Sequence, residues 1–108
     1  MFAFDYSESI RVLFGLKNSN ESMIEKIGDR VSVNLIYNHV AGTVLPRHMK
    51  WKNHVYAIEK LGLHYTLYKG NVLFHMFAVS NTDHYFLLAF NAQTLVWTLE
   101  EVADEVVN

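Results

Sequence analysis

The sequence predicts an α+β domain in which two short N-terminal helices pack on a strongly curved antiparallel sheet, or open barrel, of about five to six strands. Before about residue 30 the apolar residues recur at helical spacing, whereas after it they alternate with polar residues as in half-buried strands. The last strands are apolar on both faces, so each face needs a cover. We therefore divide a single domain, 1–108, into a helical N-terminal segment over 1–30, an antiparallel sheet over 31–102 and an acidic tail over 103–108.

Composition indicates a packed domain that needs no metal or disulfide to fold. The 108 residues are 51% hydrophobic and 19% charged, which is far from the composition of disordered chains. The absence of cysteine excludes disulfides, thiolate zinc sites and a cysteine nucleophile. No apolar run approaches the roughly 20 residues of a spanning helix, and the first residues lack the basic flank of a signal peptide. We expect a cytoplasmic protein with no membrane partner.

Two short helices are expected in the N-terminal segment. Asp5 and Glu8 have capping-box spacing ahead of apolar residues at helical intervals, which predicts the first helix. Asn20 can cap a second helix that ends at Gly28, where glycine suits the left-handed conformation of a C-terminal cap. The apolar positions of these helices are Ile10, Leu13 and Phe14, and Met23, Ile24 and Ile27.

The first half of the sheet follows from alternation. Residues 31–38 alternate apolar and polar side chains, which predicts a strand. A short extended piece over 43–45 leads to Pro46, a residue that suits a strand edge. Two further runs flank the polar step 52–53 and predict a hairpin whose apolar faces coincide. Those faces carry Met49, Trp51, His54, Tyr56 and Ile58.

Three more strands are expected in the last third of the chain. Polar turns at 80–83 and 91–94 separate apolar runs at about 71–79, 84–90 and from 95 onward. Because both faces of these runs are apolar, the helices can cover one face. Curvature of the sheet, which brings Trp51 and Tyr56 over, can close the other.

The two turns also predict a register. If they are centred as above, Phe77 lies opposite Phe86, and His75, Leu88 and Trp97 form one cross-strand row. In the same register Glu101 lies opposite His84, which predicts a partly exposed ion pair worth about 0–1 kcal/mol.

Several aromatic strand runs resemble a family of small uncharacterised bacterial proteins. The runs are W-x(4)-Y from Trp51 to Tyr56, H-x-F-x-V over 75–79, and a closing W-x-L-E-E over 97–101. The similarity covers roughly the C-terminal two-thirds of the chain. The resemblance implies one fold for residues 31–102 and brings no known activity with it.

The six histidines are the first candidates for chemistry, because neutral imidazole is both a metal ligand and a physiological general base. Their spacing contains no H-x-E-x-H, H-x-x-x-H or histidine-carboxylate set, so we expect neither a metal nor a cofactor. His75 lies mid-strand and must be hydrogen-bonded. One interpretation is a core histidine bonded to a loop carbonyl or to Tyr65. The other places His75 and His64 at the floor and rim of a small pocket walled by Tyr65, Trp51 and Tyr56.

A second candidate surface is basic and interleaved with aromatic residues, as in single-strand nucleic-acid binders. Alternation points the tryptophan between the lysines away from them, which favours a solvated basic face over a buried Trp. The net charge of −2 also argues against a dedicated nucleic-acid protein, so only weak binding is expected. The candidate residues are Arg47, Lys50, Lys52, Lys60 and Lys69.

An interaction module is the function that the sequence favours. The chain has no G-x-S-x-G elbow, no phosphate-binding glycine motif and no paired carboxylates in a predicted cleft, so an enzyme is the minority interpretation. Aromatic residues make up 14% of the chain, and aromatics surplus to one core mark interfaces. We expect a protein partner or a second copy of this chain. The alternatives are weak nucleic-acid binding and a small-molecule or metal pocket around His64 and His75.

Overall fold

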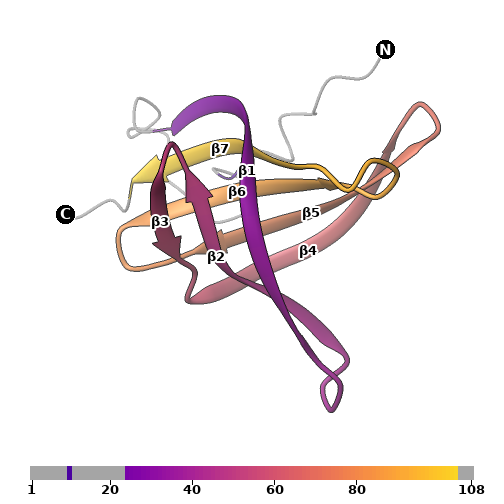
Figure 1. Ribbon diagram of the computed structural model, residues 1–108, viewed down its shortest axis with the longest axis horizontal. Helices are drawn as coiled ribbons and strands as arrows, with labels where there is room; N and C mark the ends of the chain where they lie inside the picture. The colour runs from indigo at the N-terminus through magenta and orange to yellow at the C-terminus, as the bar shows by residue number, and fades with distance from the viewer. Residues whose placement is uncertain (1–9, 11–23, 105–108) are drawn as a thin grey trace.

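The computed structural model describes Ile10 and residues 24–104. Residues 24–104 form one antiparallel sheet whose strand order is β3-β2-β1-β7-β6-β5-β4 (Figure 1). No helix in the described part of the chain has the length and apolar character needed to cross a membrane. The seven strands are β1 Ile24–Asn38, β2 Thr43–Trp51, β3 His54–Ala57, β4 Lys60–Lys69, β5 Val72–Ser80, β6 His84–Asn91 and β7 Trp97–Asp104.

The α+β class expected from the sequence is wrong, because residues 24–28 of the second expected helix belong to β1. Ile24 and Ile27 pack on opposite faces of the sheet, so their three-residue spacing reflects a strand that is apolar on both sides. Gly28 does adopt a left-handed conformation, with φ 78°, but it lies where the register of β1 against β7 shifts. The sheet therefore begins at 24 rather than 31. The first expected helix lies outside the described residues, apart from Ile10.

The sheet curls strongly, and its packing shows why. Met49 of β2 shares a buried cluster with Phe77 and Val79 of β5, although β1, β7 and β6 separate those two strands. In a flat sheet four strand spacings would hold them about 19 Å apart. The short connection from β3 to β4 joins the two edges of the curled sheet at one end: Ile58 N donates to Arg47 O of β2 at 2.8 Å, and the next residue, Glu59, donates its N–H to Ser80 O of β5 at 2.9 Å. We call the result the half-barrel.

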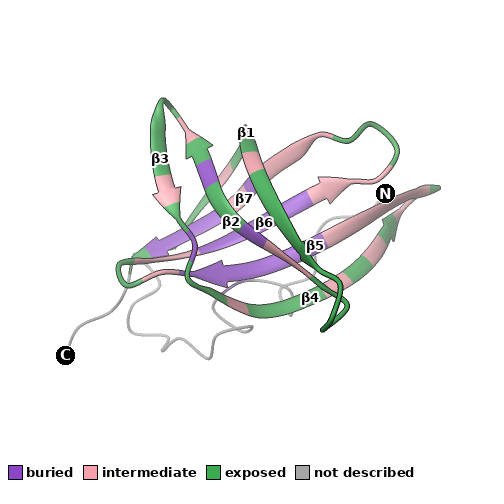
Figure 2. Ribbon diagram, turned by 60° about the horizontal axis from the view of Figure 1, so that its bottom comes forward, coloured by how far each residue is buried: buried purple, intermediate pink, exposed green. Residues whose placement is uncertain are grey.

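The half-barrel has an apolar cluster on each face, as the two-sided pattern of the last strands predicts. The inner cluster is centred on the fully buried Phe86 and Leu88, and the outer cluster on Met76, Leu87 and Ala89. Ile10 is fully buried in the outer cluster, so the N-terminal part of the chain contributes to the cover of that face. Figure 2 shows that burial concentrates in β5, β6 and β7, while the outer half of β1 and much of β4 are exposed.

The observed register of the last three strands differs by two residues from the expected one. Phe77 lies opposite Leu88 rather than Phe86, and the cross-strand row is His75, Phe90 and Trp97. The reason lies in the turns, because the first starts at Asn81 rather than Ser80, and the second starts at Asn91 as expected but extends to Leu95. In each turn the asparagine Oδ1 accepts two backbone N–H groups. Asn81 accepts from Asp83 and His84, and Asn91 accepts from Gln93 and Thr94, at 2.8 to 3.0 Å.

Candidate functional site

The most distinctive polar feature of the inner face is a pair of histidines on neighbouring strands. His64 of β4 lies opposite Phe77, and His75 of β5 lies opposite Thr66, so the two imidazoles are diagonal neighbours. His64 Nε2 and His75 Nδ1 are 2.9 Å apart, and the rings are nearly parallel, with 6° between their planes and 5.1 Å between centroids. For this hydrogen bond to form, one of the two nitrogens must carry the hydrogen and the other must accept it, so the tautomers of the two rings are coupled.

The pair borders a cavity of about 230 Å³ at the open end of the half-barrel. Every strand except β3 contributes to its wall, and that wall is almost wholly carbon. The cavity lies between the β1–β2 hairpin, which projects from the body of the molecule, and the strands that follow (Figure 1). Its lining residues are Leu35, Val44, His64, His75, Phe77, Phe90 and Trp97.

Aromatic rings form much of the cavity wall. The imidazole of His64 stacks on Phe77, with centroids 4.6 Å apart and 21° between planes. Trp97 lies at tilted angles to Phe77 and Phe90, with centroid distances of 5.4 Å and 4.8 Å. These spacings are typical of favourable aromatic pairs. The cavity thus presents several π faces to anything inside it.

Of the five residues that the sequence suggested for a pocket, the structure brings His64 and His75 together. Trp51 and Tyr56 belong to the far end of the inner cluster, where Trp51 Nε1 donates to Asp29 Oδ2 at 2.9 Å. Tyr65 packs in the outer cluster and so lies on the opposite face of the sheet. Sequence reasoning did not place Leu35, Val44, Phe90, Phe77 or Trp97 in this wall. Strand alternation placed several of them on the correct face of the sheet. No local feature of the sequence predicts that Leu35 and Val44 lie near β4 and β5.

The five candidate basic residues do not share one surface. Arg47, Lys50 and Lys52 belong to β2 and the turn after it, but Lys60 and Lys69 occupy opposite ends of β4, about 30 Å apart in an extended strand. Lys69 Nζ lies 5.3 Å from the centroid of Phe74, which belongs to the outer cluster.

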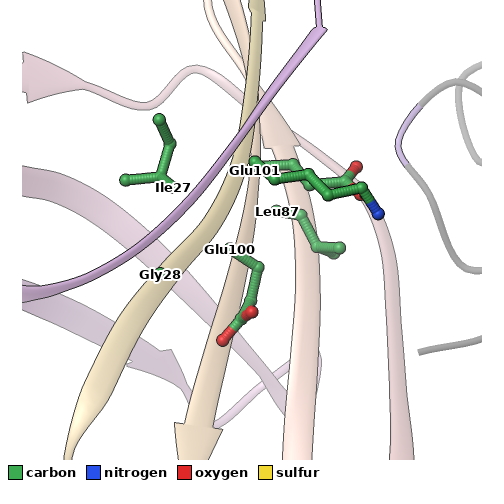
Figure 3. Close-up of a pocket in the computed structure, with 6 residues that line it drawn as sticks. Ile27, Gly28, Leu87, Glu100 and Glu101 are labelled. Carbon is green, nitrogen blue, oxygen red and sulfur yellow. The ribbon is translucent and has the colours of Figure 1, made fainter. Parts of the chain in front are cut away.

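A second hollow, of about 200 Å³, lies at a bulge in β7 (Figure 3). Glu100 is the extra residue there, because Leu87 pairs with Glu101 and Leu88 with Leu99. The buried carboxylate of Glu101 accepts the backbone N–H of Ile10 at 2.9 Å and lies 3.7 Å from Lys26 Nζ. Figure 3 shows Glu100, Glu101 and Leu87 on one side of the strands and Ile27 on the other. The hydrogen bond to Glu101 holds Ile10 against the sheet.

The bulge also overturns the expected ion pair between Glu101 and His84. His84 instead lies opposite Asp104, and their Nε2 and Oδ1 atoms are 3.6 Å apart. One extra residue in β7 moves Glu101 onto the outer face, where Lys26 and the Ile10 amide are its partners. Within the described residues, no group of three or more histidine or acidic side chains is arranged to hold a metal ion.

The histidine pair should make stability depend on pH. Burial, and secondarily the charge of His75, lowers the pKa of His64 below its ordinary value of 6.5. Between that lowered pKa and 6.5, the unfolded chain binds more protons at His64 than the folded chain does. The stability that neutral His64 gives the folded chain is therefore lost as the pH falls through the folded pKa. The loss is small because one side of the ring remains exposed.

The measurement is urea unfolding at a series of pH values on the wild-type chain and on His64→Asn. The wild-type chain should lose stability relative to the variant below pH 6.5. His39→Asn, at an exposed turn, controls for the loss of any one titrating histidine. A constant difference between wild type and His64→Asn across this range contradicts the expectation.

Comparisons of this chain with protein-family models, with curated proteins and with solved structures found no match. The fold and the cavity themselves define the class: an antiparallel half-barrel, tied at one end, with an aromatic cavity beside a histidine pair at the other.

Proposed function

We propose that this protein binds a small apolar ring compound in the cavity at the open end of the half-barrel. The observation that carries the proposal is the carbon wall formed by six strands around about 230 Å³. A dry cavity of about 150 Å³ already accommodates benzene in another protein, so this one has room for a single ring with a short substituent, or for a small bicyclic ring. Its aromatic walls favour a flat aromatic guest, since ring pairs add to the gain from burial.

The histidine pair adds hydrogen-bonding groups to an otherwise apolar cavity wall. Within the described residues, neither imidazole makes a hydrogen bond other than the one between His64 and His75. The remaining ring nitrogens, His64 Nδ1 and His75 Nε2, are therefore available to a ligand hydroxyl or to water. A phenol-like compound combines the ring that the wall favours with the hydroxyl that an imidazole can bind. Small-molecule sites typically have this composition, a largely apolar wall with few polar groups.

The test is an NMR titration of the ¹⁵N-labelled chain with phenol and with indole at millimolar concentration. Shifts should concentrate at Phe77, Phe90 and Trp97 if the cavity is the site. Val44→Phe fills the cavity from the exposed hairpin and should abolish them, whereas Val40→Phe, at a turn position that is 87% exposed, should not. Scattered shifts, or equal binding by Val44→Phe and the wild-type chain, would overturn the proposal.

A second candidate function is self-association through the β1–β2 hairpin, in line with the interaction module that the sequence favours. Four large apolar side chains are exposed on this one hairpin, and exposed apolar surface beyond scattered single residues marks interaction sites. They are Leu35, Ile36, Tyr37 and Val40.

Sedimentation at increasing protein concentration tests this second candidate. The wild-type chain should show a concentration-dependent rise in mass that Ile36→Asp suppresses. Val55→Asp, which changes an equally exposed valine on β3, serves as the control and should associate like the wild type. A strictly monomeric wild-type chain at high concentration removes this candidate and leaves the cavity proposal standing.

A further inference from the structure

The end of the sheet formed by β1, β2 and the turn before β3 carries a polar hollow of about 390 Å³. Three of its lining side chains are cationic and two more offer a hydroxyl and an amide, while none is a carboxylate. It lies on the outer face of the sheet, so it is separate from the aromatic cavity. The lining residues are Arg30, Val31, Ser32, Lys50, Lys52 and Asn53.

Strand alternation and register place the three cations together. Val31 and Val33 pack in the inner cluster, so Arg30 and Ser32 face outward. Ser32 lies opposite Lys50, and Lys52, in the turn after β2, lines the same hollow as Arg30 and Lys50. Like charges gathered around one hollow repel one another, and a bound anion relieves that repulsion.

No described carboxylate neutralises these charges. Asp29 is the acidic residue next to Arg30, but its Oδ2 accepts a hydrogen bond from Trp51 Nε1 on the inner face. Within residues 24–104, neither Arg30 nor Lys50 makes an ion pair or a side-chain hydrogen bond. The cations are therefore free to bind an external anion.

The turn between β2 and β3 fixes one side of the hollow. Lys52 and Asn53 both have left-handed backbones, with φ 51° and 64°, as in the two-residue turns that match strand twist. This conformation is costly for lysine, and such strain concentrates at functional positions. Lys52 Nζ also lies 5.1 Å from the centroid of the Trp51 ring, which restricts where the ammonium group can go.

We propose that this hollow, which we call the Arg30–Lys52 site, binds the phosphate group of a phosphate ester. A phosphate offers several oxygens and up to two negative charges, which matches three cations better than a single carboxylate does. The Arg30 guanidinium can bind two oxygens side by side, and the ammonium groups can bind the others. A small phosphate ester and the backbone of a nucleic-acid strand offer the same phosphate chemistry to this site, and the two probes of the test distinguish them.

The test is an NMR titration at low salt with two probes, inorganic pyrophosphate and a single-stranded oligothymidylate. We expect backbone shifts at Ser32, Lys50 and Asn53, and binding that weakens as salt is added. Lys52→Asn combined with Arg30→Gln should weaken binding at least about tenfold, since each removes charge-assisted hydrogen bonds. Asparagine tolerates the left-handed backbone, so this double variant keeps its turn.

Lys60→Gln is the matched control, because it removes a cation that does not line the hollow. Pyrophosphate binding that the double variant loses and Lys60→Gln retains supports the site and a small phosphate ester. Much tighter binding of the oligothymidylate with the same dependence supports the site and a nucleic-acid strand. No shifts at the site with either probe at low salt, or equal binding by the double variant, would overturn the proposal.

Discussion

Replacing Phe86 by alanine should destabilise the protein by about 3–5 kcal/mol, because truncating a fully buried aromatic ring removes its burial and leaves a cavity. Phe86 is 0% exposed and lies at the centre of the inner cluster. Its ring meets Tyr56 edge-to-face at 5.4 Å and stacks against His84 at 5.5 Å. The contact with Tyr56 joins β6 to β3, so the loss also weakens the curl of the sheet. Since domains are stable by about 5–15 kcal/mol in total, the variant should be close to unfolding.

The measurement is the midpoint of urea unfolding, with Tyr68→Ala as a matched aromatic truncation. Tyr68 is 64% exposed on β4, and its loss should change stability by no more than about 0.5 kcal/mol. Equal effects of the two variants would mean that the inner cluster does not hold the sheet together.

Replacing Glu101 by alanine should destabilise the protein by about 2 kcal/mol, because it leaves the buried amide of Ile10 without its acceptor. The carboxylate accepts that N–H at 2.9 Å and lies 3.7 Å from the Lys26 ammonium group. Hydrogen exchange should report the loss directly, as faster exchange of the Ile10 amide together with a lower unfolding midpoint. Unchanged exchange at Ile10 would contradict the role of Glu101 as the anchor of this part of the chain.

The neighbouring residue, Glu100, provides a control, because its replacement should increase rather than decrease the stability of the protein. Burial raises the pKa of Glu100 above its ordinary value of 4.5, although Lys69 and Lys26 act in the other direction. The folded chain then binds more protons than the unfolded one just above pH 4.5, so this contribution to stability is lost as the pH rises through the folded pKa. Glu100→Gln should therefore be more stable than the wild-type chain at neutral pH, and the difference should vanish in acid. A destabilised Glu100→Gln at neutral pH would contradict this.

The sequence predicted most of the strands in this protein but not which residues pair across them. Alternation correctly assigned most strands after residue 31 and the inward direction of Phe77, but it did not predict β4, so the sheet has seven strands rather than five to six. Up to the bulge in β7 the register differs by two residues from the expected one, because the first turn starts at Asn81 and the second extends to Leu95. A slip of two preserves the face of every side chain, since the period of a strand is two, but it changes the residue across the ladder. His75 therefore faced inward as expected, with Phe90 rather than Leu88 beside it.

The N-terminal boundary failed for a related reason. Ile24 and Ile27 have helical spacing, but in β1 they serve different faces of a sheet that is apolar on both sides. Gly28 was expected to be left-handed, and it is, yet that conformation serves a register shift as well as a helix cap. A single residue such as Gly28 can therefore indicate a left-handed backbone without indicating whether it lies in a helix or in a strand.

By itself, the sequence determined which side chains of the later strands face inward, as far as the bulge at Glu100, and with them the inward orientation of His75. That property is local, since it needs only the alternation of a pleated strand. Only the tertiary structure decided that the β1–β2 hairpin closes over β4 and β5, so that Leu35 and Val44 complete a cavity beside the histidine pair. The physical reason is that curling is collective: it follows from burying Met49 against Phe77 across three intervening strands, a gain that no single segment of the chain contains.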